Sequence, residues 1–314
     1  TREKLDSTYY NLKNFGRANN FNQNLQVNYN LPINKFPLLD WISSNLRYSS
    51  KYIWSAGSFQ QADSLGNIIE NNREYTLGSK LDISKFYDKI PILKSYNKKY
   101  NKEDSIKSIF RSRAFDGIMK AIMSLRSINL TYNVTERTGL AGVIGEPGVF
   151  GMNNFYNSPG WNFIFGSQDS EIRRIAAQNG WLVKNDFLNN PFIQSRSNNF
   201  QFRSTLQPLN FLRIQLDAKR IITENFQETF RYDTQSDSYV SLTPSRGGNF
   251  SLSFLAIRTA FIKDDESNNS PTFINFAQNR EIFRDRLNAL NSQGEYGLNS
   301  QDVLIPAFIS AYSK

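Results

Sequence analysis

The sequence of 314 residues contains no cysteine and no histidine. Without cysteine there can be no disulfide, no thiol nucleophile and no thiolate metal site. Without histidine the commonest general base and the commonest metal ligand are missing as well. A run of about 18 apolar residues, the length that a membrane-spanning helix needs, is also absent. We therefore expect a protein that is not an enzyme and that holds no metal and no cofactor.

Aromatic residues, in contrast, are abundant: 25 Phe, 15 Tyr and 4 Trp make up 14% of the chain. The mean hydropathy is nevertheless −0.52, because Asn, Ser and Gln are common too. This combination is typical of strands that have one apolar face and one hydrated face. The composition therefore predicts a β-rich protein rather than a bundle of transmembrane helices.

The stretch "NLRYSSKYIWSAG", residues 45–57, is the clearest example of such alternation. Leu46, Tyr48, Tyr52 and Trp54 fall on one parity, which only Ser50 interrupts. Since successive side chains of a strand point to opposite faces, these residues predict one apolar face. That face would contact either a protein core or lipid.

The same alternation recurs along the chain and predicts about eight strands, several of them longer than strands of soluble proteins usually are. Outer-membrane strands need about nine to eleven residues, which favours a membrane sheet over a soluble β-rich domain. On this interpretation the candidate lipid-facing residues are Leu46, Tyr48, Tyr52, Trp54, Leu77, Leu81 and Ile214. The stretches that alternate are 24–30, 45–57, 75–83, 127–136, 199–207, 211–220, 224–233 and 249–257.

Long connections between the strands are expected to have structure of their own. Residues 139–199 form a long insertion with a helix near 169–179, and residues 273–314 form a helical C-terminal stretch. A further helix is expected at about 102–123. The segment "PGWNFIFG" is either a short packed strand or an aromatic site for sugars or a hydrophobic partner. The acidic run at 264–266 fits an exposed loop tip better than a calcium loop.

A net charge of +9 calls for an anionic partner or a basic lumen. Lys and Arg are scattered singly along the strands rather than clustered in a nucleic-acid-binding module, so we expect no nucleic acid partner. Two explanations of the positive charge remain: contact with a surface rich in lipopolysaccharide, or a lumen lined with basic side chains.

Several segments, in this order, resemble the SprA/Sov family, the giant outer-membrane translocons of the type 9 secretion system and gliding machinery. The resemblance extends from residue 36 to the end and implies that the chain is a piece of a longer protein. The matching segments are "FPLLDWISSNLRYSSKYIWSAG", "LGNIIENN", "KFYDKIPILKSYNKKY", "MSLRSINLTYNVTERTGLAGVIG", "PGWNFIFGSQ", "IAAQNGWL" and "QDVLIPAFISAYS".

The resemblance implies a mainly β chain that supplies about eight to ten strands to one very large, membrane-spanning antiparallel β-barrel with helical and Gly-rich loop insertions. The barrel would pass folded cargo proteins to the cell surface and support gliding motility. Expected partners are a PorV-like small barrel protein, a periplasmic plug protein, secreted cargo, lipid and lipopolysaccharide, all at the bacterial outer membrane. The Gly-rich loop becomes a candidate for gating or partner contact, through Gly142, Val143, Ile144, Gly145, Pro147 and Phe150.

Two other functional classes stay open on the sequence. One is a soluble or surface-attached β-rich binding module, such as an adhesin or a carbohydrate-binding domain. The other is a ligand-specific outer-membrane transporter, which would carry a globular N-terminal plug and an energy-coupling box; neither is visible in the sequence. A membrane barrel would partition into detergent and change its gel mobility on heating. This observation would distinguish the two membrane hypotheses from the soluble binding module.

Overall fold

The chain divides into two compact units, Thr1–Ser251 and Leu252–Lys314. The computed structural model describes residues 18–58, 62–91, 93–94, 122–209, 211–254, 256, 259–290 and 295–313.

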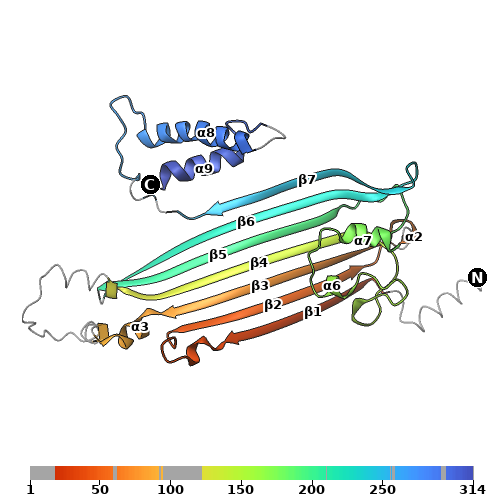
Figure 1. Ribbon diagram of the computed structural model, residues 1–314, viewed down its shortest axis with the longest axis horizontal. Coiled ribbons are helices and arrows are strands. Elements are labelled where there is room, and N and C mark those ends of the chain that lie inside the picture. Colours follow the sequence, from red (N-terminus) through yellow and green to blue (C-terminus); the bar gives the residue numbers. More distant parts are fainter. Residues whose placement is uncertain are drawn as a thin grey trace, which may run out of the picture. The chain divides into compact units, whose positions relative to one another are not determined.

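The first unit is built on one sheet of seven strands that follow one another in sequence order (Figure 1). The five pairs from β1 to β6 are antiparallel, and β7 follows β6 after a short turn and lies beside it. The prediction of a mainly β, antiparallel fold is thereby confirmed. The strands are β1 (Asn20–Leu31), β2 (Ile42–Ser55), β3 (Asn67–Asp82), β4 (Leu125–Val143), β5 (Phe192–Leu209), β6 (Leu212–Asp233) and β7 (Ser238–Leu252).

The strands are long, and the length of β6 explains why the sheet has seven strands where about eight were expected. Residues 211–220 and 224–233 were expected to form two strands, but β6 runs through both as one strand of 22 residues. At about 3.4 Å per residue it extends over roughly 75 Å. Among the described residues, β1 and β7 each have a strand on one side only, so the sheet is open.

Short helices and one long insertion connect the strands. Between β4 and β5, residues 144–191 (hereafter the insertion) carry η2 (Val149–Gly151), α6 (Trp161–Ile164) and α7 (Ile172–Gln178). Helix α7 lies within the range 169–179 expected from the sequence. The other short elements are η1 (Pro32–Lys35), α2 (Ala62–Leu65) and α3 (Ile83–Lys89). Most of the helix expected at 102–123 lies outside the described residues.

Apolar clusters lie toward both ends of the strands, where Figure 1 shows α6 and α7 at one end and α3 at the other. The larger one packs the insertion against the sheet and reaches from Phe21 of β1 to Tyr239 of β7. The smaller one packs Ile83 and Tyr87 of α3 against Met123, with Trp41 and Phe86 at its edge. The long middle part of the sheet lies between these clusters.

The second unit is a pair of helices, α8 (Pro271–Leu290) and α9 (Gln301–Tyr312). Val303, Ala307 and Ala311 are the fully buried residues of α9, and their spacing of four places them on one face. Aromatic rings of Phe276 and Phe308 pack edge to face between the two helices. None of the helices in the described part of the chain is long and apolar enough to cross a membrane.

Candidate functional site: a two-faced sheet

The strand register carries apolar side chains across the sheet in rows. Leu46 of β2 pairs with Leu77 of β3, which pairs with Tyr132 of β4, which in turn pairs with Phe200 of β5. Nine large apolar side chains of this face are between 39% and 53% exposed. We call them the apolar belt, and they extend over β1 to β6: Leu25, Val27, Tyr29, Leu46, Leu77, Tyr132, Phe200, Ile214 and Leu216.

The opposite face of the same strands is polar, because each belt residue alternates with a hydrophilic one. Ion pairs cross between strands on this face, from Arg137 to Glu70 at 2.6 Å and from Arg203 to Asp217 at 2.5 Å. On β1 to β3 the polar face carries Asn22, Asn24, Gln26, Asn28, Asn30, Asn45, Arg47, Ser49, Lys51, Asn72, Glu74, Thr76 and Lys80. One sheet thus has one mainly apolar and one hydrated surface, and the charged side chain in the belt rows is Arg220 of β6, the register partner of Phe200.

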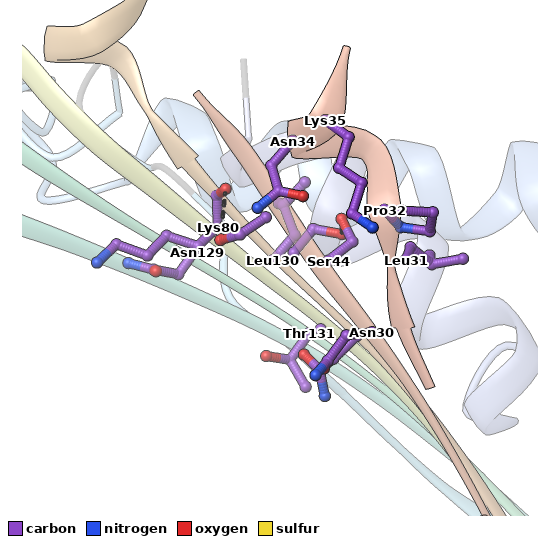
Figure 2. A pocket seen from close by; sticks show the side chains of 14 residues that line it. Asn30, Leu31, Pro32, Asn34, Lys35, Ser44, Lys80, Asn129, Leu130 and Thr131 are labelled. Atoms are coloured by element: carbon purple, nitrogen blue, oxygen red, sulfur yellow. Dashed lines mark hydrogen bonds between the residues drawn. The ribbon is translucent and has the colours of Figure 1, made fainter. Parts of the chain in front are cut away.

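A cavity of about 770 Å³ lies beside η1, over the ends of β1 to β4 (Figure 2). Asn34 and Lys35 of the η1 turn line it together with Lys80 of β3 and Asn129 and Thr131 of β4. Its lining residues include two lysines and no carboxylate. The cavity therefore offers hydrogen bonds and positive charge, but no pair of groups for acid–base chemistry.

The insertion covers the belt face at one end of the strands. Tyr52 and Trp54 share the parity of Leu46, yet they are only 1% and 2% exposed because Phe163, Ile164 and Trp181 of the insertion pack over them. For Tyr52 and Trp54 the expected lipid-facing position is therefore wrong: both belong to a protein core. The alternation places both residues on the apolar face of β2, but it does not reveal which part of the chain covers that face.

The other five predicted lipid-facing residues lie on the same face, and three of them are uncovered. Leu46, Leu77 and Ile214 belong to the apolar belt. Tyr48 is half-buried and donates its hydroxyl hydrogen to the carbonyl oxygen of Phe165 in the insertion, at 2.5 Å. Leu81 packs against the α3 cluster at the other end.

A buried polar network fastens the insertion to the sheet. Asn71 of β3 is completely buried, and its amide donates to the carbonyl oxygens of Phe163 at 2.8 Å and Ser167 at 2.7 Å. Gln168 donates to Asn71 Oδ1 and accepts from Thr138 Oγ1 at 2.6 Å. Since buried polar groups are costly when unpaired, this network holds the insertion in one position.

A row of charged residues crosses the sheet between the belt and the insertion. Arg73, Glu136 and Arg196 are register partners on β3, β4 and β5. The carboxylate of Glu136 lies 2.6 Å from the guanidinium of Arg73 and 3.6 Å from that of Arg196. Beneath the insertion, Arg173 of α7 pairs with buried Glu228 of β6. Each buried charge therefore has an opposite charge beside it.

The Gly-rich candidate loop is divided between core and surface. Gly142 and Val143 are buried at the end of β4, and a Cβ at Gly142 would lie 2.6 Å from Leu188. The backbone N–H of Ile144 donates to the carbonyl oxygen of Trp181, and Gly145 and Pro147 are half-buried. Of the six candidate residues Phe150 alone is strongly exposed, at 64%, next to Val149 at 72%. The first residues of this loop thus hold the insertion, and its tip faces outward.

Sequence reasoning missed the residues of the polar network, although a signal was present. Ser50, Asn71 and Thr138 are small polar residues that interrupt the apolar parity of three neighbouring strands. Such interruptions mark the place along the strands where the apolar face passes from its exposed part to the part that the insertion covers. In addition, "PGWNFIFG" was expected as a possible short strand, but Trp161–Ile164 is a helix with Phe163 buried and Trp161 exposed.

No protein-family model matches the chain, and no curated protein matches it. Within the described residues, no group of three acidic side chains could hold a metal ion. The candidate functional site is therefore defined by the two faces of the sheet themselves.

Proposed function

We propose that the sheet is part of the wall of a large outer-membrane β-barrel through which folded proteins pass to the cell surface. The observation that carries the proposal is the apolar belt, which crosses six strands on one face and lies opposite a polar face. In such a wall the apolar face contacts lipid and the polar face contacts water.

The size of the belt supports a lipid neighbour. From Phe200 to Leu206 on β5, six steps of about 3.4 Å give about 20 Å, which is most of the roughly 25 Å apolar band of outer-membrane barrels. Covering each half-exposed side chain contributes about 1 to 2 kcal/mol, so the nine together contribute on the order of 10 kcal/mol. An apolar surface of this extent is rarely left in contact with water.

The open sheet supports the view that this chain supplies only part of a barrel. A strand edge in hydrocarbon leaves backbone N–H and C=O groups without partners, so β1 and β7 need further strands in a membrane. The protein-conducting role, gliding motility, cargo, the PorV-like partner and the plug protein follow from the resemblance of the sequence to the SprA/Sov family. Lipopolysaccharide is the anionic partner proposed for the positive net charge.

The test uses the fact that the chain has no cysteine. Spin labels are attached at Leu77→Cys on the belt and at its neighbour Thr76→Cys on the polar face, in the intact protein in its native or reconstituted membrane. Collisions with oxygen, which concentrates in lipid, and with a water-soluble nickel complex are measured at each site. We expect Leu77→Cys to collide mainly with oxygen and Thr76→Cys mainly with nickel.

The same measurement distinguishes the soluble or surface-attached binding module. In such a module another protein layer would cover the belt, and the label at residue 77 would collide rarely with either reagent. That result in a particle that needs no detergent would overturn the proposed membrane wall.

A further inference from the structure

The insertion lies on the same face of the sheet as the apolar belt, immediately beyond the end of the belt. Tyr48 donates to the carbonyl oxygen of Phe165, and Ser50 Oγ donates to that of Ile164 at 3.2 Å. Tyr48 is two residues from belt residue Leu46, a distance of about 7 Å along the strand. Helix α6 is therefore fixed at the border of the belt.

Two aromatic side chains project from α6 at this border. Trp161 and Phe165 are 48% and 45% exposed, and their rings stack with centroids 5.9 Å apart and planes at 18°. They are four residues apart, so they share one side of the helical turn. Phe163, on the other side, is 2% exposed in the core beneath. The pair is thus placed by α6 and its C-terminal residue, and both side chains remain about half exposed.

The position and chemistry of this pair fit the interfacial region of a bilayer. Trp and Tyr concentrate where hydrocarbon meets the headgroups, since an apolar ring with a polar N–H or O–H suits both, and Phe165 adds an apolar ring beside Trp161. The charged row of Arg73, Glu136 and Arg196 lies at the same level of the sheet, where the apolar rows end. Charged side chains are tolerated at a headgroup boundary and are costly deeper in the membrane.

We propose that the insertion lies outside the barrel wall, on the membrane surface, where Trp161 and Phe165 enter the interfacial layer of the lipid and set the depth of the wall. This inference rests on the proposed function, because it takes the belt as the lipid-facing surface. It follows that the insertion does not fold into the lumen. The occupant of the aromatic pair is therefore lipid and not cargo.

The test compares the depths of three spin labels on single cysteines introduced into this cysteine-free chain, in the intact protein in lipid, with any cysteine outside these 314 residues replaced by serine. Leu77→Cys reports the belt, Trp161→Cys the aromatic pair and Phe187→Cys a control position on the insertion. Phe187 is 78% exposed, and the adjacent Asp186 accepts hydrogen bonds from Thr234 in the turn at the end of β6, away from the belt. We expect residue 77 deep in the hydrocarbon, residue 161 at headgroup level and residue 187 in water.

The outcomes separate the proposed membrane wall from the proposed surface position of the insertion. If residue 77 is in lipid while residue 161 is as accessible to the nickel complex as residue 187, the surface position of the insertion is refuted and the membrane wall stands. If residue 77 is not in lipid, both proposals fail. If residue 161 lies deeper than residue 77, the insertion is not interfacial and the inference is also wrong.

A second measurement leaves the tryptophan in place. Lipids brominated near the headgroup quench tryptophan fluorescence at shallow depth, and Trp54 and Trp181 are shielded because both are buried. Trp41 is half-buried at the α3 cluster, toward the other end of the strands, and adds the same background to every variant. We expect Trp161→Phe to remove at least half of the shallow quenching seen in the unmodified protein. The matched substitution Phe187→Leu should leave the quenching unchanged. Equal quenching in the Trp161→Phe variant and the unmodified protein would overturn the inference.

Discussion

Replacement of Asn71 by Ala should loosen the insertion without disturbing the sheet. Asn71 is fully buried, and it supplies two hydrogens to the carbonyl oxygens of Phe163 and Ser167 and one acceptor to Gln168. In the alanine variant the carbonyl oxygen of Ser167 loses its side-chain partner, and the carbonyl oxygen of Phe163 and the amide of Gln168 each keep a weaker or single bond to Gly166. Since a buried group left unpaired costs about 1–3 kcal/mol and partial relaxation recovers some of it, we expect a loss of roughly 2–4 kcal/mol.

The matched control is Asn72→Ala, one residue further along β3. Its side chain is on the polar face, away from the insertion, because successive residues of a strand point to opposite faces. A substitution at this half-buried position should change stability by no more than about 0.5 kcal/mol. The two variants share the residue type, the strand and the substitution, and they differ in the face and therefore in burial and in contact with the insertion.

Amide hydrogen exchange of the insertion is the appropriate assay, because it measures the free energy of local opening. A loss of 2–4 kcal/mol predicts exchange in residues 163–168 about 30 to 1,000 times faster in Asn71→Ala, since about 1.4 kcal/mol is tenfold. Amides in the middle of β3 should keep their protection in both variants. Equal exchange of 163–168 in the two variants would refute the role assigned to the buried network.

Three further substitutions test other parts of the molecule. Gly151→Ala should destabilise the first unit by about 1–3 kcal/mol in thermal unfolding, since its φ is +84° and a Cβ would lie 2.6 Å from the ring of Tyr52. The pKa of Asp265 is lowered by hydrogen bonds from the backbone N–H and side-chain amide of a nearby asparagine, and by a serine N–H. The pKa of Asp265 is therefore lower in the folded than in the unfolded protein. Its hydrogen bonds stabilise the loop above the usual Asp range, and this stabilisation is lost as the pH falls through the lowered pKa. Asp265→Asn should remove this pH dependence, measured as the amide NMR shifts of the loop. Leu77→Arg should lower the yield of membrane-assembled protein, at a cost of about 2–4 kcal/mol in lipid, whereas Thr76→Arg should have little effect.

The alternation of side chains made the sheet predictable, since it reports directly which residues share a face. It failed locally in β6, where Ile221 and Ile222 are both apolar and break the pattern. The strand nevertheless continues, because both residues pair with Asn199 and Asn198 of β5. Backbone pairing with a neighbouring strand outweighs the local pattern of one strand.

The covering of Tyr52 and Trp54 could not be read from their own strand. Their parity shows an apolar face, but the covering side chains come from residues more than a hundred positions later, such as Phe163 and Trp181. A periodic pattern reports the presence of an apolar face and not its neighbour. Only the small polar residues that interrupt the pattern, such as Asn71, mark the change from an open face to a covered one.

The strands are longer than a bilayer requires, and the charged row lies where the same strand passes from an exposed apolar face to a face covered by protein. On the belt side of the row the apolar face is open, and on the other side the same face is covered by protein. A single charge at this border would be costly beside hydrocarbon, whereas Glu136 between Arg73 and Arg196 satisfies its charge within the row. If the belt contacts lipid, the row therefore divides β3, β4 and β5 into a membrane part and a part that carries the insertion, and the lipid boundary in the sheet coincides with the level at which Trp161 and Phe165 lie.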